Sequence, residues 1–175
     1  MNTIYLLRHG ETIWNREGRM QGSLDSPLTP KGRVQAARQG AILRGLGIGA
    51  RAFASPRGRA RSTAALAGLH VDLDERLAEM SMGTWEGRVR PGGAGASGVL
   101  WKFAAPGGET QAALIDRLRA FNATLPAESV VVTHGVVCIA LRAMAAGLAP
   151  TQWDLRDDPQ GVVWRIAETG ETLLR

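Results

Sequence analysis

Short apolar runs separated by helical patterns dominate the arrangement of hydrophobic and polar residues along this chain. Residues 3–7 (TIYLL) and 129–133 (SVVVT) are apolar at nearly every position, which is typical of strands buried on both faces. Residues 52–54 form another short run, and weaker strand patterns cover 71–73, 161–166 and 172–174. The pattern predicts a sheet of short strands.

Helical patterns fill the intervals between these runs. Thr29 followed by Pro30 is typical of a helix start, with an N-cap and then proline at the first helical position. This helix is predicted to end at the glycines near residue 45, and others are predicted over about 55–69, 109–125 and 135–146. The alternation predicts an α/β fold, a three-layer α/β/α sandwich with a mostly parallel central sheet.

Three segments show neither the apolar runs of strands nor the helical pattern. Residues 10–28 predict a long loop, and long ordered loops in compact domains are usually functional. Residues 71–87 look irregular, and the tract 91–98 (PGGAGASG) has a composition that cannot build a core. The length of 175 residues predicts a single domain over 1–175, with a Gly-rich flap at about 88–108.

Composition and charge favour a small anionic partner. The net charge is +5, but the arginines are scattered over loops without the aromatic interleaving of single-strand binders, so nucleic acid is not expected. The chain lacks an apolar run long enough for a membrane span, and a signal-peptide pattern is missing. The single cysteine, Cys138, reads as core filling and suits a reducing compartment. We therefore expect a cytoplasmic protein; its sequence gives no sign of an oligomeric state.

Two of the three histidines occupy matching positions. His9 follows the 3–7 run, His134 follows the 129–133 run, and a glycine comes after each. Arg59 lies just beyond the 52–54 run. Ligands of α/β proteins bind at the carboxyl ends of the strands, so these side chains are expected to meet in one site. His70 has no such placement and reads as an ordinary histidine.

The residue types in this site favour phosphoryl transfer. The chain has no HxH or HExxH spacing, so neither a metal site nor a cofactor is expected, and it has no GxSxG nucleophile elbow. A neutral histidine can act as a covalent nucleophile. The guanidinium groups of Arg8 and Arg59 suit the oxygens of a transferring phosphoryl group.

Four blocks in this order make a resemblance specific: RHGET (8–12) continuing to Trp14 and Asn15, SPRGRARSTA (55–64), LAEMSMGTWEG (77–87) and VVTHG (131–135). With the PGGET block (106–110), the chain resembles the histidine phosphatase superfamily, also called the phosphoglycerate mutase-like family, over residues 3 to about 147. The resemblance implies a phosphoglycerate mutase-like fold.

It also implies roles for individual residues. By similarity, His9 is the nucleophile that becomes phosphorylated, and Glu79 is the general acid that protonates the leaving oxygen and then activates water. Arg8, Arg59 and His134 would form the phosphate pocket, with His134 donating to a phosphate oxygen.

Three further residues match family positions that contact the substrate. Asn15 would add a neutral hydrogen bond to the phosphate, and Gln21 and Gly22 would line the substrate side.

The other carboxylates near these motifs read as structural. Trp85 and Gly87 suggest a structural turn for Glu86, whereas Glu11 can point to solvent. Glu109 stands near a helix start, where a negative charge is favourable anyway.

The roles of four arginines are left open. Arg57 and Arg61 are either surface charges or residues that recognise the substrate. Arg88 and Arg90 could contact a second anionic group of the substrate. Two departures from the family pattern, arginine at position 57 and methionine at position 82, affect specificity and leave the chemistry intact.

The interval between the acid and the second histidine bears on the reaction. It spans only 55 residues here (134 − 79), whereas the cofactor-dependent mutases of this family carry a long insertion with extra substrate-binding arginines. The resemblance therefore implies a metal-independent histidine acid phosphatase-type phosphoric monoester hydrolase acting on a small phosphorylated molecule. A phosphoglycerate mutase-type phosphotransferase is the alternative, and a catalytically idle phosphate-binding module is a third possibility.

Overall fold

A six-stranded sheet in the order β3-β2-β4-β1-β5-β6 forms the centre of the protein. The computed structural model describes residues 2–89 and 98–175. Strands β1 (Thr3–Arg8), β2 (Arg51–Ala54), β3 (Val71–Leu73) and β4 (Glu128–Thr133) are parallel to one another. Strand β5 (Val163–Ala167) pairs antiparallel with β1, and β6 (Gly170–Leu174) pairs antiparallel with β5. The predicted mostly parallel sheet is confirmed.

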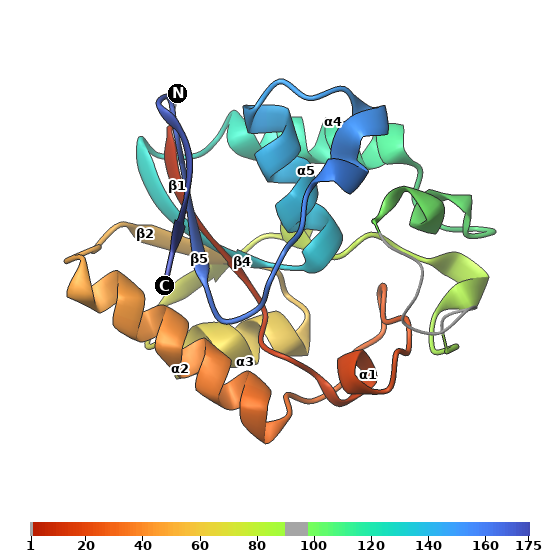
Figure 1. Ribbon diagram of the computed structural model, residues 1–175, viewed down its shortest axis with the longest axis horizontal. Helices are drawn as coiled ribbons and strands as arrows, with labels where there is room; N and C mark the ends of the chain where they lie inside the picture. Colours follow the sequence, from red (N-terminus) through yellow and green to blue (C-terminus); the bar gives the residue numbers. More distant parts are fainter. Residues whose placement is uncertain (1, 90–97) are drawn as a thin grey trace.

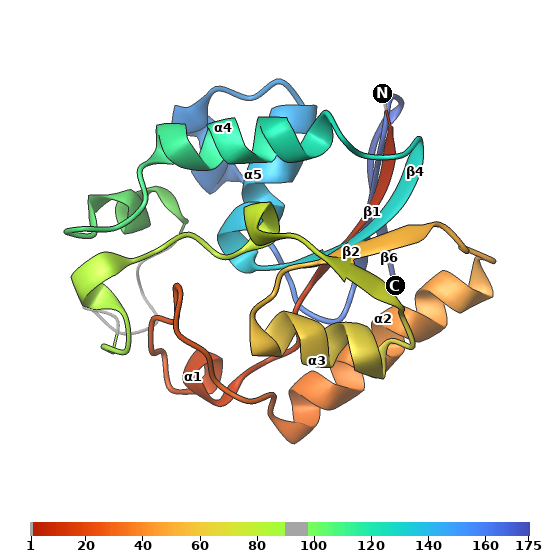
Figure 2. The same cartoon turned by 180° about the vertical axis from the view of Figure 1, so that it is seen from behind.

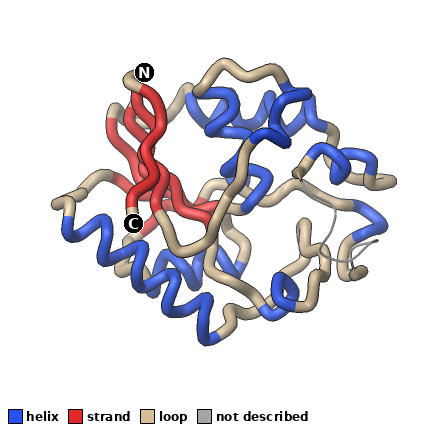
Figure 3. The backbone as a smooth tube through the Cα atoms, viewed as in Figure 1, coloured by secondary structure: helices blue, strands red, loops and turns tan. Residues whose placement is uncertain are grey.

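Helices cover both faces of this sheet (Figure 1). Helices α2 (Pro30–Gly45) and α3 (Gly58–Leu66) lie on one face. Helices α4 (Gln111–Asn122) and α5 (Gly135–Ala145) lie on the other, as the reverse view in Figure 2 also shows. Figure 3 shows the strands gathered between the two helical layers, with both chain ends beside the sheet. The predicted three-layer sandwich is therefore confirmed.

Alternate residues of β1 enter two separate cores. Leu6 packs in the cluster that contains Leu118 of α4, whereas Leu7 packs in the cluster that contains Leu43 of α2. Successive side chains of a strand point to opposite faces, so a strand covered on both sides must be apolar at every position. This requirement explains the unbroken apolar runs of β1 and β4.

The helix starts follow from local capping. The Thr29 hydroxyl accepts a hydrogen bond from the Gly32 amide at 3.0 Å, and Pro30 is the first helical residue, as predicted. The region expected as a loop over 10–28 differs, because it contains the short helix α1 (Ile13–Arg16). Thr12 and Asn15 cap this helix reciprocally, but four residues are too few to show an apolar stripe.

Short 3₁₀ helices lie in the connections between the longer helices and strands. They are η1 (Glu75–Leu77), η2 (Gly83–Trp85), η4 (Leu100–Ala104) and η5 (Pro150–Leu155). Residues 90–97 of the predicted flap lie outside the described residues. In the described part of the predicted flap, Val99 and Ala105 are buried. The Asp154 carboxylate accepts hydrogen bonds from the Val99 and Leu100 amides.

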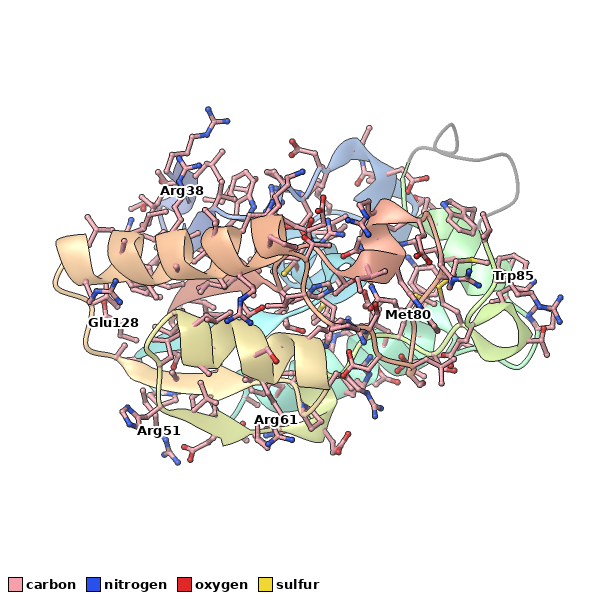
Figure 4. All side chains as sticks on the ribbon, turned by 90° about the horizontal axis from the view of Figure 1, so that it is seen from below. Arg38, Arg51, Arg61, Met80, Trp85 and Glu128 are labelled. Atoms are coloured by element: carbon pink, nitrogen blue, oxygen red, sulfur yellow. The ribbon has the colours of Figure 1, made fainter. Side chains whose placement is uncertain are left out.

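The loops that follow the parallel strands gather at one end of the molecule. Figure 4 shows Glu128, where β4 begins, at one end, and Met80 and Trp85 toward the opposite end. The segments that follow β1, β2 and β4 meet there, as ligand-binding segments of α/β sheets do. Within the described residues, no helix is long and apolar enough to cross a membrane.

Candidate active site

His9 stands directly after β1 and is almost fully buried, with 2% of the residue exposed. Its amide donates to the Thr133 carbonyl at 2.9 Å, which continues the pairing of β1 with β4. Its Nδ1 donates to the Gly10 carbonyl at 2.8 Å, and a carbonyl can only accept, so Nδ1 carries the proton of the neutral ring. The lone pair is therefore on Nε2. Burial, then the charges of Arg59 and Arg8, hold the pKa of His9 well below 6.5.

Two glycines allow the segment after His9 to pack directly against helix α2. A Cβ on Gly10 would lie 2.2 Å from the Gly32 carbonyl oxygen, and a Cβ on Gly32 would lie 2.0 Å from the Glu11 carbonyl oxygen. The Gly10 amide also donates to the Thr63 hydroxyl of α3 at 3.0 Å. Helices α2 and α3 thus fix the backbone that carries His9.

Arg59 is held by protein acceptors on three sides. Its Nη1 donates to the Leu24 carbonyl at 2.6 Å and the Asp25 carboxylate at 3.1 Å, and its Nη2 donates to the Gly22 carbonyl at 2.9 Å. Its Nε donates to His134 Nδ1 at 3.1 Å. Within the described part of the chain, these contacts use four of the five guanidinium N–H groups and leave one for a ligand.

His134 follows β4 and lies behind His9, with 5.2 Å between the two ring centroids. Both of its ring nitrogens contact protein, because Nδ1 accepts from Arg59 and Nε2 donates to the Ser55 hydroxyl at 2.6 Å. Burial and then Arg59 lower its pKa well below 6.5. Its side chain does not cap α5. The expected donation to a phosphate oxygen stays a prediction, and it requires one of these two contacts to open.

Arg8 and Glu79 complete the charged part of the site. Arg8 Nη1 donates to the Asp158 carbonyl at 2.6 Å. The Glu79 carboxylate accepts from the Met80 amide at 3.1 Å and from the Val136 amide, in the first turn of α5, at 3.3 Å. Glu79 is thus oriented by backbone on two sides.

His9, Arg8, Arg59 and Glu79 line a cavity of about 210 Å³. This volume lies below the roughly 300–1,000 Å³ of pockets for drug-sized ligands, so the cavity suits a small molecule. His134 has no exposed surface and is not among the lining residues.

The three predicted substrate contacts also line the cavity. Asn15 Oδ1 accepts from the Thr12 amide and from Gln160 Nε2, so its amide nitrogen is the part that remains for a ligand. Gln21 Oε1 is buried and has no hydrogen-bond partner among the described residues. Gly22 has a φ of 53°, and a Cβ there would lie 2.2 Å from Glu86 Oε1.

The structural interpretations of Glu86 and Glu109 are confirmed. Glu86 Oε1 accepts from the Ser23 amide at 2.8 Å, the Met82 amide at 2.9 Å and the Ser81 hydroxyl at 3.2 Å, which joins two loops of the site. Glu109 pairs in a bidentate manner with Arg117, at 2.6 and 2.8 Å.

Glu11 turns toward helix α2, where its carboxylate accepts from Thr29 at 2.9 Å and from Lys31 at 3.0 Å. The hydrogen bond from Lys31 is the main cause of its lowered pKa.

Of the four arginines of open role, the three that the structure describes are not among the residues that line the cavity. Arg61 and Arg88 are exposed, Arg57 is half-buried, and Figure 4 shows Arg61 on the outer side of α3. Arg90 lies outside the described residues.

Two groups of site residues were missed by sequence reasoning. The first forms the cavity wall and mouth: Trp14, Arg19, Met20, Trp101 and Lys102, beside Met82, for which an effect on specificity was expected. The second contacts the two site histidines away from the cavity. Ser55 holds His134, and Gln160 Nε2 donates to the His9 carbonyl at 3.0 Å. For Ser55, the Ser-Pro start of the second predicted helix was an available signal. For Gln160 there was none, because it is 151 residues from His9.

Fold and site together define an α/β protein with a cavity lined by a histidine, two arginines and a glutamate at the carboxyl ends of its parallel strands. A sequence profile of the histidine phosphatase superfamily (branch 1) matches residues 4–172. The chain belongs to this superfamily. Among the described residues, no group of three or more His, Cys, Asp or Glu side chains could hold a metal ion.

Relatives and solved structures agree with this assignment. A probable phosphoglycerate mutase, GpmB, of Erwinia tasmaniensis is 38% identical over 166 residues, covering 85% of this chain and 76% of that protein. GpmB of Salmonella arizonae is 46% identical over 92 residues, covering 50% of this chain and 42% of the relative.

Among solved structures, the Mycobacterium tuberculosis open reading frame Rv3214 matches with a TM-score of 0.84 at 29% identity, covering 98% of this chain and 95% of that one. A phosphoglycerate mutase from Thermus thermophilus matches with a TM-score of 0.76 at 32% identity, over 99% and 98% of the chains.

Proposed function

We propose that this protein is a phosphomonoester hydrolase that acts through a phosphohistidine on His9. One observation carries the proposal: a buried, neutral His9, with its lone pair on Nε2, borders a small cavity between Arg8 and Arg59. A neutral imidazole can attack phosphorus, and two cations at the same place stabilise the charge on the phosphoryl oxygens.

The reaction proceeds in two balanced steps. His9 Nε2 forms a bond to phosphorus while the bond from phosphorus to the ester oxygen breaks, and Glu79 gives its proton to the leaving alkoxide. Water then attacks the phosphohistidine, Glu79 accepts a proton from that water, and inorganic phosphate and free His9 are released.

Hydrolysis is favoured over mutase activity by the short interval between Glu79 and His134 and by the size of the cavity. Retaining a product for a second phosphoryl transfer needs additional contacts to its other groups, whereas water needs none. The mutase alternative is supported by the names of the curated relatives and by Arg19 and Lys102 at the cavity, which suit a second anionic group.

We also keep a cytoplasmic location as part of the proposal, supported by the single buried thiol of Cys138.

Two assays on one preparation test these alternatives. A panel of phosphomonoesters, with a chelator present, measures phosphate release, and conversion of 3-phosphoglycerate to 2-phosphoglycerate measures mutase activity. The compared proteins are wild type, His9→Ala and the matched control His70→Ala, whose histidine is exposed. We expect phosphate release by wild type and His70→Ala, with a loss of at least about 10³-fold in His9→Ala.

Three outcomes contradict the proposal. Isomerisation faster than phosphate release supports the mutase alternative. Activity that survives in His9→Ala removes the covalent mechanism. Phosphate binding without turnover, and without acid-labile labelling of His9, indicates the idle binding module.

A further inference from the structure

A buried carboxylate without hydrogen bonds lies next to the site. Asp158 precedes β5, its side chain is 2% exposed, and neither carboxylate oxygen has a hydrogen-bond partner among the described residues. Native proteins seldom leave a buried charged group in this state, because removing a carboxylate from water costs several kcal/mol. The group therefore needs an explanation that the catalytic steps above do not supply.

Arg8 is the cation in contact with this carboxylate. Its Nε lies 3.7 Å from Asp158 Oδ2, which is an ion pair without a hydrogen bond. The same arginine donates Nη1 to the Asp158 backbone carbonyl at 2.6 Å. The backbone contact thus fixes where Arg8 stands, whereas the carboxylate adds a charge beside it. Arg8 also lines the cavity that holds His9 and Glu79.

We propose that the charge of the Asp158 carboxylate sets, through Arg8, how tightly the cavity holds an anion. When Asp158 is ionised, its charge offsets that of Arg8 and opposes an anion entering the cavity. When Asp158 is protonated, the full charge of Arg8 acts on that anion.

The surroundings of Asp158 place this change near neutral pH. Burial raises the pKa of Asp158 to about 7, although Arg8 and Arg142 oppose the rise. Several ionisable groups act on or near Asp158. Arg8 lies on β1, and Arg142 and Cys138 lie on α5. Glu79 lies in the loop after η1, and Asp157 precedes Asp158 in the chain. Arg142 is engaged elsewhere, since it donates to Glu171 and to the Asp157 carbonyl.

The direction of the effect follows from the sign of the charge. Below about pH 7, Asp158 is neutral and the anion binds tightly; as the pH rises through about 7, Asp158 ionises and binding weakens. His9 and His134 do not produce this change, because burial keeps both rings neutral in this range. Binding of an anion must, by linkage, favour uptake of a proton by Asp158.

Sulfate is a suitable probe, because its two charges do not change in this pH range. Its Kd is measured by isothermal titration calorimetry at about pH 6 and about pH 8 with wild type, Asp158→Asn and Asp157→Asn. Asp158→Asn removes the charge and keeps the backbone carbonyl that holds Arg8. Asp157→Asn is the matched control, because it removes the same charge from the exposed neighbouring side chain.

We expect the Kd of wild type and of Asp157→Asn to rise about ten-fold from pH 6 to pH 8. The Kd of Asp158→Asn should change less than about two-fold and stay near the tight value of wild type at low pH. A pH dependence retained in Asp158→Asn, or missing from wild type, overturns the inference.

A second measurement needs no variant and covers the case in which Asp158→Asn fails to fold. Calorimetry of wild type near pH 7 in two buffers of different ionisation enthalpy reports protons taken up with sulfate. Uptake supports the inference, and zero uptake overturns it. The inference rests on the phosphate pocket of the proposed function, and the outcomes separate the two. Absence of sulfate binding at every pH removes the pocket and the inference together, whereas binding without the Asp158-dependent change removes the inference alone.

Discussion

The contact between helix α2 and the segment after His9 makes Gly32→Ala a sharp test of how the site is held. A Cβ at this position would lie 2.0 Å from the Glu11 carbonyl oxygen and 2.8 Å from the Glu11 amide nitrogen. Backbone atoms cannot rotate away as the end of a side chain can, so either α2 or the Gly10–Glu11 backbone must move. We expect both stability and activity to fall.

The magnitude follows from two opposing effects. Overpacking against fixed neighbours costs about 3 kcal/mol at the upper end of its usual range, while alanine in a helix gains about 1 kcal/mol over glycine. The net loss is about 2 kcal/mol, which lowers the Tm of a chain of this length by roughly 4–8 °C. Because a displacement of about 1 Å of a reacting group can cost about 10²-fold in rate, kcat should fall at least ten-fold.

Gly45→Ala is the matched control for Gly32→Ala. Gly45 lies in the last turn of the same helix, is exposed, and has no atom within 4 Å of the position of an added Cβ. This variant should gain up to about 1 kcal/mol and keep its activity. Thermal unfolding and steady-state phosphatase assays measure both variants. A Gly32→Ala protein that is as stable and as active as wild type would refute the close approach of these two backbones.

Two further predictions concern charge and loop contacts. The stability advantage of wild type over His134→Asn should shrink as the pH falls below about 6.5, because unfolded His134 binds a proton that the folded state, with its lowered pKa, excludes. Urea unfolding at several pH values tests this, and a constant difference contradicts it. Glu86→Ala should lose about 2–3 kcal/mol, because it leaves the Ser23 and Met82 amides without their acceptor, whereas Glu86→Gln keeps that acceptor. Equal urea midpoints for the two Glu86 variants would count against this contact.

The parts of the fold that depend on local pattern were predictable from the sequence. Strands β1 and β4 are buried on both faces, so their apolar runs are unambiguous, and Thr29 with Pro30 marks the start of α2 through local capping. The carboxyl ends of β1 and β4 then place His9 and His134 in one region. These features need only neighbouring residues and general rules of α/β sheets.

The supporting contacts of the site could not be predicted in this way. Gln160 and Asp158 reach His9 and Arg8 only because β5 returns antiparallel beside β1. That pairing joins residues about 150 positions apart, and nothing near Gln160 in the sequence indicates it. Helix α1 was missed for a different reason, since four residues cannot display a helical period.

The pairing of β1 with β5 also determines when the site can form during synthesis. His9 leaves the ribosome well before its partner Gln160, which follows 151 residues later. At about 5–20 residues per second, that interval lasts roughly 8–30 s. The nascent chain therefore exposes the RHGET segment before the residues that close the site behind it are made. The complete set of contacts around His9 can therefore form only after β5 has been made.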